Sequence, residues 1–164
     1  MLGYQKRSGE NGMAFSQEQL ESIRQAASSP FPFISRCEAR VEELQQGFCR
    51  AMMPYKPNVN HVGTMYAGAL FTLAELPGGA LFLSSFDSSR FYPIVRDAQI
   101  RFRRPAKTDV RVDVSISEEE VQRVQKETEE QGKCDFELES ELRDENGEVV
   151  AISKIMYQLR KIGG

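Results

Sequence analysis

Residues 58–83 read NVNHVGTMYAGALFTLAELPGGALFL, and this stretch decides the fold of the chain. A polar loop at its start gives way to an almost wholly apolar run from Met65 to Leu83, in which only Thr72 and Glu75 are distinctly polar. A helix of this composition has no face suited to water, so protein must surround it on nearly all sides. Burial of an unpaired carboxylate is costly, and the presence of Glu75 therefore needs a reason.

The apolar run also approaches the length of a membrane-spanning helix, which is about 20 residues. Glu75, Pro77 and two glycines lie in the middle of the run, and no second such segment occurs. Because a carboxylate at bilayer depth is unfavourable, a core helix is the preferred interpretation. In a core helix Glu75 either serves function or pairs with an arginine elsewhere in the fold. Pro77 has no amide hydrogen for the carbonyl of Leu73, which predicts a kink or a break there.

Composition indicates an ordinary globular domain. The chain has 164 residues, of which 24 are acidic and 21 basic, with a net charge of −3. This charge gives no general attraction to nucleic acid or membranes, so neither is expected as a partner. Three scattered cysteines and a single histidine predict no disulfide framework, no metal site and a cytoplasmic setting. Residues 1–15 lack a secretory signal and predict a disordered or loosely ordered tail before one domain over residues 16–164.

The segment before the apolar run predicts one helix and two strands. Ser16 is placed to cap a short amphipathic helix, which Pro30 and Pro32 bring to an end. The strands are expected over residues 39–44 and 48–53, around a glycine-containing turn.

After the apolar run, alternation of apolar and polar residues predicts four strands. They are expected over residues 94–102, 110–116, 134–142 and 149–160. In the first of them Arg96 alone interrupts the apolar row, and the turn Asp144-Glu-Asn-Gly147 joins the last two as a hairpin. The charged segment 117–131 predicts a short exposed helix with Ser117 and Glu120 as a capping box, or else an extended hairpin.

Together these elements predict an α+β architecture. Strands with one polar face favour an antiparallel sheet. The economical way to bury the apolar helix is to wrap this sheet around it as a curved layer.

The motif NHVGTMYAGALFTLAE, from Asn60 to Glu75, resembles that of hotdog-fold acyl-CoA thioesterases of the phenylacetate-degradation type, approximately N-x-x-x-[ST]-x-H-G-G-x-x-F-x-L-A-[DE]. The matching positions are Asn60, Thr64, Gly68, Phe71, Leu73, Ala74 and Glu75. The segment AQIRFRRP at 98–105 is similar to a strand of that family, and the likeness extends from about Phe31 to Ile162. The family's His-Gly-Gly is Tyr66-Ala67-Gly68 here, a departure that bears on the substrate more than on the fold.

Thioester hydrolysis needs a carboxylate to activate water or attack the carbonyl, and donors where negative charge develops. If the helix starts near residues 64–66, the amides of Ala67 and Gly68 lie unpaired in its first turn, at the positive end of its dipole, and are the predicted oxyanion donors. Glu75 is the predicted base, about 10 Å further along the axis. That is too far for one small carbonyl, but the resemblance implies a site between two subunits, with the carboxylate from one and the amides from the other.

Four more residues near the helix start complete the predicted site. Asn60 is the remaining catalytic candidate, while His61, Thr64 and Tyr66 are candidates for substrate binding. Asn60 and His61 are placed to orient water or bind the thioester, with loop capping and an exposed histidine as the alternatives. Tyr66 is equally suited to an acyl pocket or to the core of a dimer.

The densest basic cluster, Arg101, Arg103 and Arg104 with Lys107, is predicted to bind the phosphates of coenzyme A, with a solvated strand face as the alternative. The predicted function is a cytoplasmic acyl-CoA thioesterase, a homodimer or homotetramer that needs no metal and no cofactor beyond the coenzyme A of its substrate. A non-catalytic hotdog module that binds an acyl or aromatic ligand is the alternative. A hotdog dehydratase is a third interpretation. Such enzymes commonly use a histidine together with an Asp or Glu, and His61 precedes the helix start, which does not suit that pattern.

Overall fold

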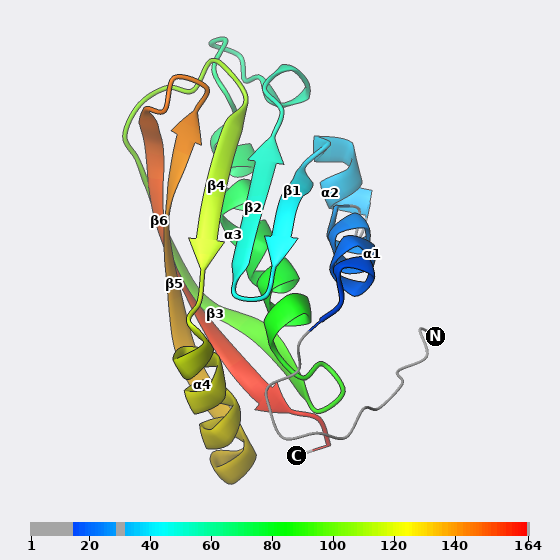
Figure 1. Ribbon diagram of the computed structural model, residues 1–164. Coiled ribbons are helices and arrows are strands. Elements are labelled where there is room, and N and C mark those ends of the chain that lie inside the picture. Colours follow the sequence, from blue (N-terminus) through cyan, green and yellow to red (C-terminus); the bar gives the residue numbers. More distant parts are fainter. Residues whose placement is uncertain (1–14, 29–31, 164) are drawn as a thin grey trace.

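A six-stranded antiparallel sheet, in the order β1-β2-β4-β5-β6-β3, carries the fold (Figure 1). The computed structural model describes residues 15–28 and 32–163, so nearly all of the tail predicted for residues 1–15 lies outside the described residues. The strands are β1 Arg40–Gln45, β2 Phe48–Met53, β3 Phe91–Phe102, β4 Val110–Ser115, β5 Lys133–Asp144 and β6 Val149–Lys161. All six predicted strands are therefore confirmed, with small shifts at their ends.

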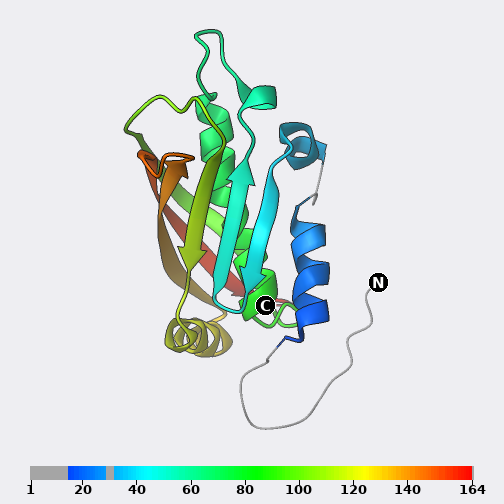
Figure 2. The ribbon, with the colours of Figure 1, turned by 45° about the horizontal axis from the view of Figure 1, so that its top comes forward.

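The helix α3, Ala67–Ser85, is the long apolar helix that the sequence predicts, and the curved sheet wraps around it (Figure 2). It is long and apolar enough to cross a membrane, yet 67% of its apolar window is buried inside the protein. The predicted α+β architecture, with α3 as its core helix, is thus confirmed. Of the predicted kink or break at Pro77, the break is wrong, because α3 continues through that residue. Packing of a buried helix outweighs the loss of one backbone hydrogen bond.

In the described part of the chain, three further α-helices lie outside the sheet, and a 3-10 helix, Lys56–Asn58, follows β2. The helix α1, Gln17–Ala27, begins with a capping box between Ser16 and Gln19, and α4, Glu118–Gln131, begins where the Ser117 hydroxyl accepts the amide of Glu120. The predicted helix over 117–131 is confirmed, and the hairpin alternative is wrong. The short α2, Pro32–Cys37, was not predicted; its first residue is a proline, which fits a helix start as well as a helix end.

A β-bulge in β3 explains why Arg96 interrupts the apolar row. The register with β6 shifts at this residue. The extra residue in β3 moves the side chains after it to the opposite face from the one that simple alternation predicts. As a result Ala98 lies opposite Ile155, on the face that turns toward α3, whereas Ile94 lies opposite Gln158 on the other face. The apolar row predicted over residues 94–102 therefore does not lie on one face, because the alternation changes side at the bulge.

The two edge strands of the sheet differ in whether other groups bond to their outer sides. At β1 the helix α1 lies alongside, and Arg24 donates to the carbonyl of Val41 at 2.9 Å while the amide of Val41 donates to the hydroxyl of Ser28 at 3.0 Å (Figure 1). At the other edge β3 pairs only with β6. Within residues 15–28 and 32–163, nothing pairs with the outer side of β3.

Candidate active site

The loop between β2 and α3 is held together by the side chain of Asn60. Its Oδ1 accepts from the amides of Val62 at 3.0 Å and Thr64 at 3.1 Å, and its Nδ2 donates to the Thr64 hydroxyl at 2.9 Å. These bonds use both lone pairs of Oδ1 and leave one hydrogen of Nδ2 for a ligand. The structure thus gives Asn60 the loop-capping role that was its alternative interpretation. Neighbouring His61 is exposed and, within the described part of the chain, has no hydrogen-bond partner.

The first turn of α3 presents free backbone donors. The helix begins at Ala67 with Tyr66 as its N-cap, and the amides of Ala69 and Leu70 both donate to the carbonyl of Tyr66. Among the residues that the structure describes, the amides of Ala67 and Gly68 have no acceptor. They therefore point their hydrogens outward at the positive end of the helix dipole, where an anion is stabilised.

The ring of Tyr66 occupies the space beside Gly68. A Cβ atom on Gly68 would lie 2.4 Å from Cε1 of Tyr66, so a larger residue at this position would push the ring aside. The ring is itself 60% exposed and makes no side-chain hydrogen bond among the described residues. The tyrosine ring thus lies in the space that the missing side chain of Gly68 leaves beside the helix.

An open cavity of about 340 Å³ lies beside the first turn of α3. It is lined by Asn60, Thr64, Met65, Ala67, Leu70, Phe102, Arg103, Arg104, Pro105 and Ala106. Five predicted site residues thus meet in one place, although they come from two distant segments. A hydrogen bond of 2.8 Å from the amide of Met65 to the carbonyl of Ala106 joins those segments. The apolar lining residues were not predicted from the sequence, and the Arg-Pro segment is the signal that indicates this region.

The basic cluster is divided by the fold. Arg103 and Arg104 line the cavity, whereas Arg101 and Lys107 do not. Arg101 belongs to β3, whereas Arg103 comes directly after the last residue of that strand, so the strand does not hold both side chains. Arg104 forms an ion pair with Glu148, while the guanidinium of Arg103 has no partner among residues 15–28 and 32–163. Arg103 is therefore the free cation of the cavity.

Glu75 lies two turns beyond the cavity, on the same helix. Its side chain is half-buried, and burial raises the pKa of the carboxyl group because the charged form is poorly solvated there. No arginine or lysine of the described residues forms an ion pair with it, so the alternative of a paired core glutamate is not observed. A raised pKa and a free carboxylate suit a general base.

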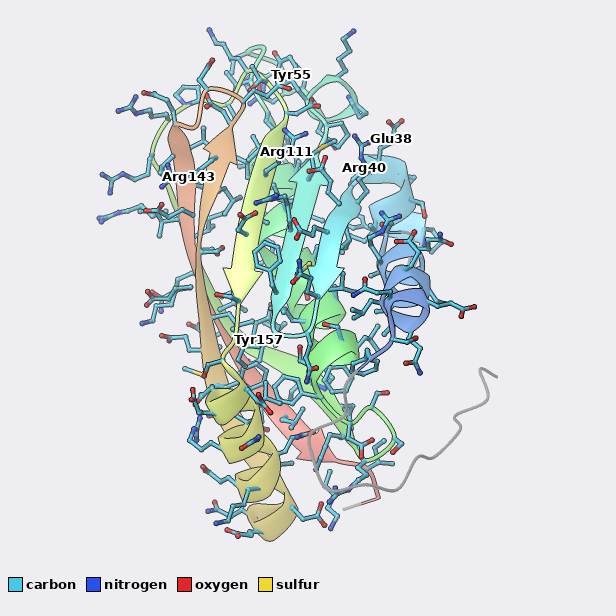
Figure 3. All side chains as sticks on the ribbon, viewed as in Figure 1. Glu38, Arg40, Tyr55, Arg111, Arg143 and Tyr157 are labelled. Carbon is cyan, nitrogen blue, oxygen red and sulfur yellow. The ribbon has the colours of Figure 1, made fainter. Side chains whose placement is uncertain are left out.

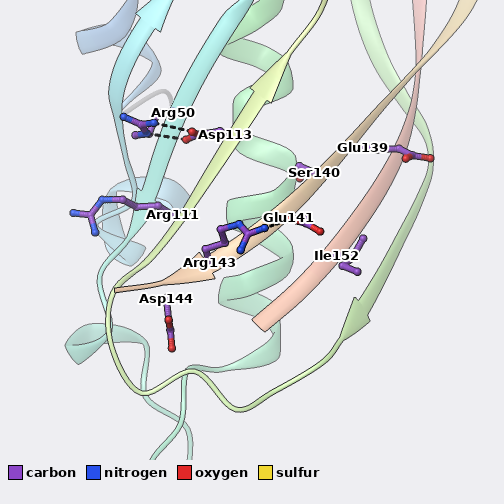
Figure 4. Close-up of a pocket in the computed structure, with 9 residues that line it drawn as sticks. All are labelled: Arg50, Arg111, Asp113, Glu139, Ser140, Glu141, Arg143, Asp144 and Ile152. Atoms are coloured by element: carbon purple, nitrogen blue, oxygen red, sulfur yellow. Dashed lines mark hydrogen bonds and ion pairs between the residues drawn. The ribbon is translucent and has the colours of Figure 1, made fainter. Parts of the chain in front are cut away.

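A second cavity, of about 610 Å³, opens on the outer face of the sheet where the pairing of β4 with β5 stops (Figure 4). Its three arginines, Arg50, Arg111 and Arg143, two of which are labelled in Figure 3, are paired with carboxylates. No free cation therefore remains there to bind a phosphate. In the described part of the chain, no three His, Cys, Asp or Glu side chains lie together so as to hold a metal ion.

Comparison with known proteins assigns the chain to a family. The model of the family described as Domain of unknown function (DUF4442) matches residues 20–159. A Pseudomonas aeruginosa protein of unknown function, described as a probable thioesterase, is 50% identical with a TM-score of 0.85, over 92% of this chain and 99% of that one. No curated protein matches the sequence.

Two more distant structures share the fold. A thioesterase from Haemophilus influenzae is 15% identical with a TM-score of 0.70, over 93% of this chain and 95% of that one. A protein of unknown function from Chlorobaculum tepidum is 16% identical with a TM-score of 0.77, over 87% and 94%. The chain therefore belongs to the family described as Domain of unknown function (DUF4442), with the α+β hotdog fold that its thioesterase neighbours share.

Proposed function

We propose that the protein is a cytoplasmic hydrolase of acyl-CoA thioesters whose active site lies between two copies of the chain. The observation that carries this proposal is the cavity at the start of α3, where unpaired helix amides lie near the free cation Arg103. In this proposal the thioester oxygen docks on the amides of Ala67 and Gly68, which stabilise the negative charge of the tetrahedral intermediate. Because the Tyr66 ring lies beside Gly68, it moves aside in this proposal when the thioester docks there.

Glu75 acts as the base in this proposal. It takes a proton from water, the resulting hydroxide attacks the carbonyl carbon, and the thiolate of coenzyme A leaves and takes up a proton. Because Glu75 lies about 10 Å along the axis from Gly68, it cannot easily serve the amides of its own helix. The proposed mechanism therefore pairs Glu75 with the amides of the second copy. No metal or cofactor is needed, since the thiolate is a good leaving group.

Exposed apolar side chains support the proposal that a second copy of the chain completes the site. Val95 and Phe102 lie on the face of β3 that turns toward α3, opposite the buried Tyr157 and Ala151. They are nevertheless 42% and 49% exposed, and the α3 residue Phe71 is exposed as well. Pairing of β3 with β3 of a second copy would extend the sheet across a two-fold axis and cover these side chains. Dimer and tetramer both fit this arrangement.

Arg103 and Arg104 are the proposed contacts for the phosphates of coenzyme A. A free guanidinium at the mouth of a cavity can bind a phosphate through two parallel hydrogen bonds. Arg104 would exchange its partner Glu148 for the phosphate. Thr64 and Asn60 line the same cavity, and the remaining Nδ2 hydrogen of Asn60 is directed by the loop bonds that hold this side chain.

The direct test is hydrolysis of short, long and aromatic acyl-CoAs by the wild-type protein and by Glu75→Gln. The expected result is turnover by the wild type on at least one class and loss of turnover in a variant that remains folded and dimeric. Equal turnover by the two proteins would remove Glu75 from the mechanism.

A mixing experiment tests whether the site is shared. Ala67→Pro removes one proposed oxyanion donor at the first helical position, where proline is well accepted. If the site is shared, mixed dimers of Ala67→Pro and Glu75→Gln contain one intact site, and random mixing restores about a quarter of the wild-type activity. If each helix serves its own site, mixing restores none.

A non-catalytic binding module is the second candidate function. The position of the Tyr66 ring beside Gly68 favours it, because the ring takes up space next to one of the two proposed oxyanion donors. This candidate predicts that acyl-CoA binds, as measured by calorimetry, without release of coenzyme A. Removal of the ring in Tyr66→Ala would then leave hydrolysis absent, whereas a ring that only gates the enzyme would leave Tyr66→Ala active.

A further inference from the structure

Tyr157 of β6 contacts the turn of α3 that carries Glu75. Its hydroxyl donates to the backbone carbonyl of Glu75 at 3.2 Å. The side chain is 3% exposed, and its ring stacks on Phe136 with a centroid distance of 5.5 Å. A buried and stacked ring has little freedom, so the position of the hydroxyl is fixed by the sheet. Figure 3 labels this residue.

The sequence of α3 makes room for this contact. A Cβ atom on Gly78 would lie 2.1 Å from the hydroxyl oxygen of Tyr157 and 2.3 Å from Cζ. The tyrosine therefore fits against the helix only because residue 78 is a glycine. The neighbouring Gly79 has nothing within 4 Å of its own Cβ position, so its lack of a side chain serves no such contact.

The same turn is weakened from within. Pro77 cannot donate to the carbonyl of Leu73, and glycine has a low helix propensity, so Pro77 and the two glycines leave this part of α3 with little local stability. Burial, followed by the nearby charge of Glu75, raises the pKa of Tyr157, so the phenol keeps its proton. A neutral phenol remains a hydrogen-bond donor at every pH where the enzyme would work.

We propose that Tyr157 is a positioning residue, which holds the turn at Glu75 so that the carboxylate is presented to water in one orientation. The inference rests on the proposed function, because it concerns the proposed base. Its physical basis is that the hydroxyl supplies, from a rigid strand, a hydrogen bond to a turn that its own sequence leaves weak. Small displacements of a catalytic group lower the rate without weakening substrate binding.

The variant Tyr157→Phe tests the hydrogen bond, since it keeps the stacked ring and removes only the hydroxyl. The expected result is a fall in kcat of about tenfold with an unchanged KM. Amide exchange at residues 76–80 of α3 should rise while exchange in β5 and β6 stays as in the wild type. An unchanged kcat, or a rise of KM alone, would overturn the positioning role.

A double variant shows whether Tyr157 acts through Glu75. If it does, Tyr157→Phe has no further effect on the residual rate of Glu75→Gln. If the two losses multiply, Tyr157 does not act through Glu75 and the inference is wrong. Normal turnover by Glu75→Gln would instead overturn the proposed function, whereas a full kcat in Tyr157→Phe beside an inactive Glu75→Gln would overturn only the positioning role.

The adjacent glycines offer a matched pair of variants. Gly78→Ala places a methyl group against the Tyr157 ring and should lower kcat at least as much as Tyr157→Phe, with KM unchanged. Gly79→Ala adds the same methyl group to an open position and should leave kcat unchanged. Equal kcat values for these two variants would contradict the inference. If Gly78→Ala fails to fold, Tyr157→Phe decides the question alone.

Discussion

The two edge strands of the sheet, β1 and β3, differ in what lies against their outer sides. On β1 the side chains of Arg24 and Ser28 occupy the carbonyl and amide of Val41, and α1 lies alongside the strand. On β3 the outer side has no partner among the described residues, and the apolar side chains Val95 and Phe102 are exposed.

This difference indicates which edge strand is available to pair with another chain. An edge strand with unpaired backbone groups can form hydrogen bonds with a strand of another chain. Proteins commonly block such edges with charged side chains or a covering element. The chain blocks one edge in this manner and leaves the other open, with apolar residues beside it. The contrast therefore supports β3 as the place where a second copy adds its own strand, and the predictions below test this.

The largest effect is expected from a charge placed on the open edge. Val95→Asp should prevent pairing of two β3 strands, so that the protein becomes monomeric and loses activity by more than about a hundredfold, because each proposed site needs both copies. Light scattering after gel filtration measures the mass, and release of coenzyme A measures activity. Arg40→Asp on the β1 edge is the matched control and should remain dimeric and active. A monomer in both variants would remove the distinction between the edges.

A smaller effect is expected where β3 ends. Arg103→Glu replaces the free cation of the cavity and should raise KM for an acyl-CoA about tenfold, since one charge-assisted contact to a phosphate is replaced by repulsion. kcat should change little. Initial rates over a range of substrate concentrations separate the two constants, and an acyl-pantetheine without the nucleotide phosphates should show no difference between variant and wild type. Unchanged KM values would make Arg103 structural.

The pH dependence follows from the raised pKa of Glu75. As a base the carboxylate must be ionised, so kcat should fall as the pH is lowered through this raised pKa, at a higher pH than for an ordinary glutamate. The effect of pH on stability has the opposite sign. Because the pKa of Glu75 is higher in the folded state, this group stabilises the folded protein at pH values below its unfolded-state pKa. The contribution is lost as the pH rises through the folded-state pKa. Glu75→Gln should therefore be more stable than the wild type at neutral pH and not at low pH. Urea titrations at the two pH values give the comparison.

The smallest effect is expected at the blocked edge. Ser28→Ala removes the acceptor of the Val41 amide and should lower the free energy of unfolding by about 1 kcal/mol, the usual contribution of one hydrogen bond. Activity and dimer mass should not change, because this edge takes no part in the proposed site. Chemical denaturation followed by circular dichroism provides the value. A change of oligomeric state instead would mean that β1 also contributes to assembly.

Much of the architecture could be predicted because local patterns determine it. The apolar run that became α3 and the alternation in β4 and β5 depend only on neighbouring residues, and both are found where expected. Arg96 was noticed as an interruption, but whether it turned inward or formed a bulge depends on the register with β6. Residue type alone left Asn60 with two interpretations, of which the family resemblance favoured the catalytic one. Its hydrogen bonds to Thr64 depend on the folded loop and could not be predicted.

The sequence by itself determined that one apolar helix with a single carboxylate must lie at the centre of a curved sheet, because no other arrangement hides that helix from water. Only the tertiary structure decided what surrounds the helix. Arg103 meets Ala67 in one cavity, Gly78 receives the ring of Tyr157, and Glu75 remains without a charged partner among the described residues. Such contacts join segments far apart in the chain, and strand register, which no local pattern encodes, brings them together.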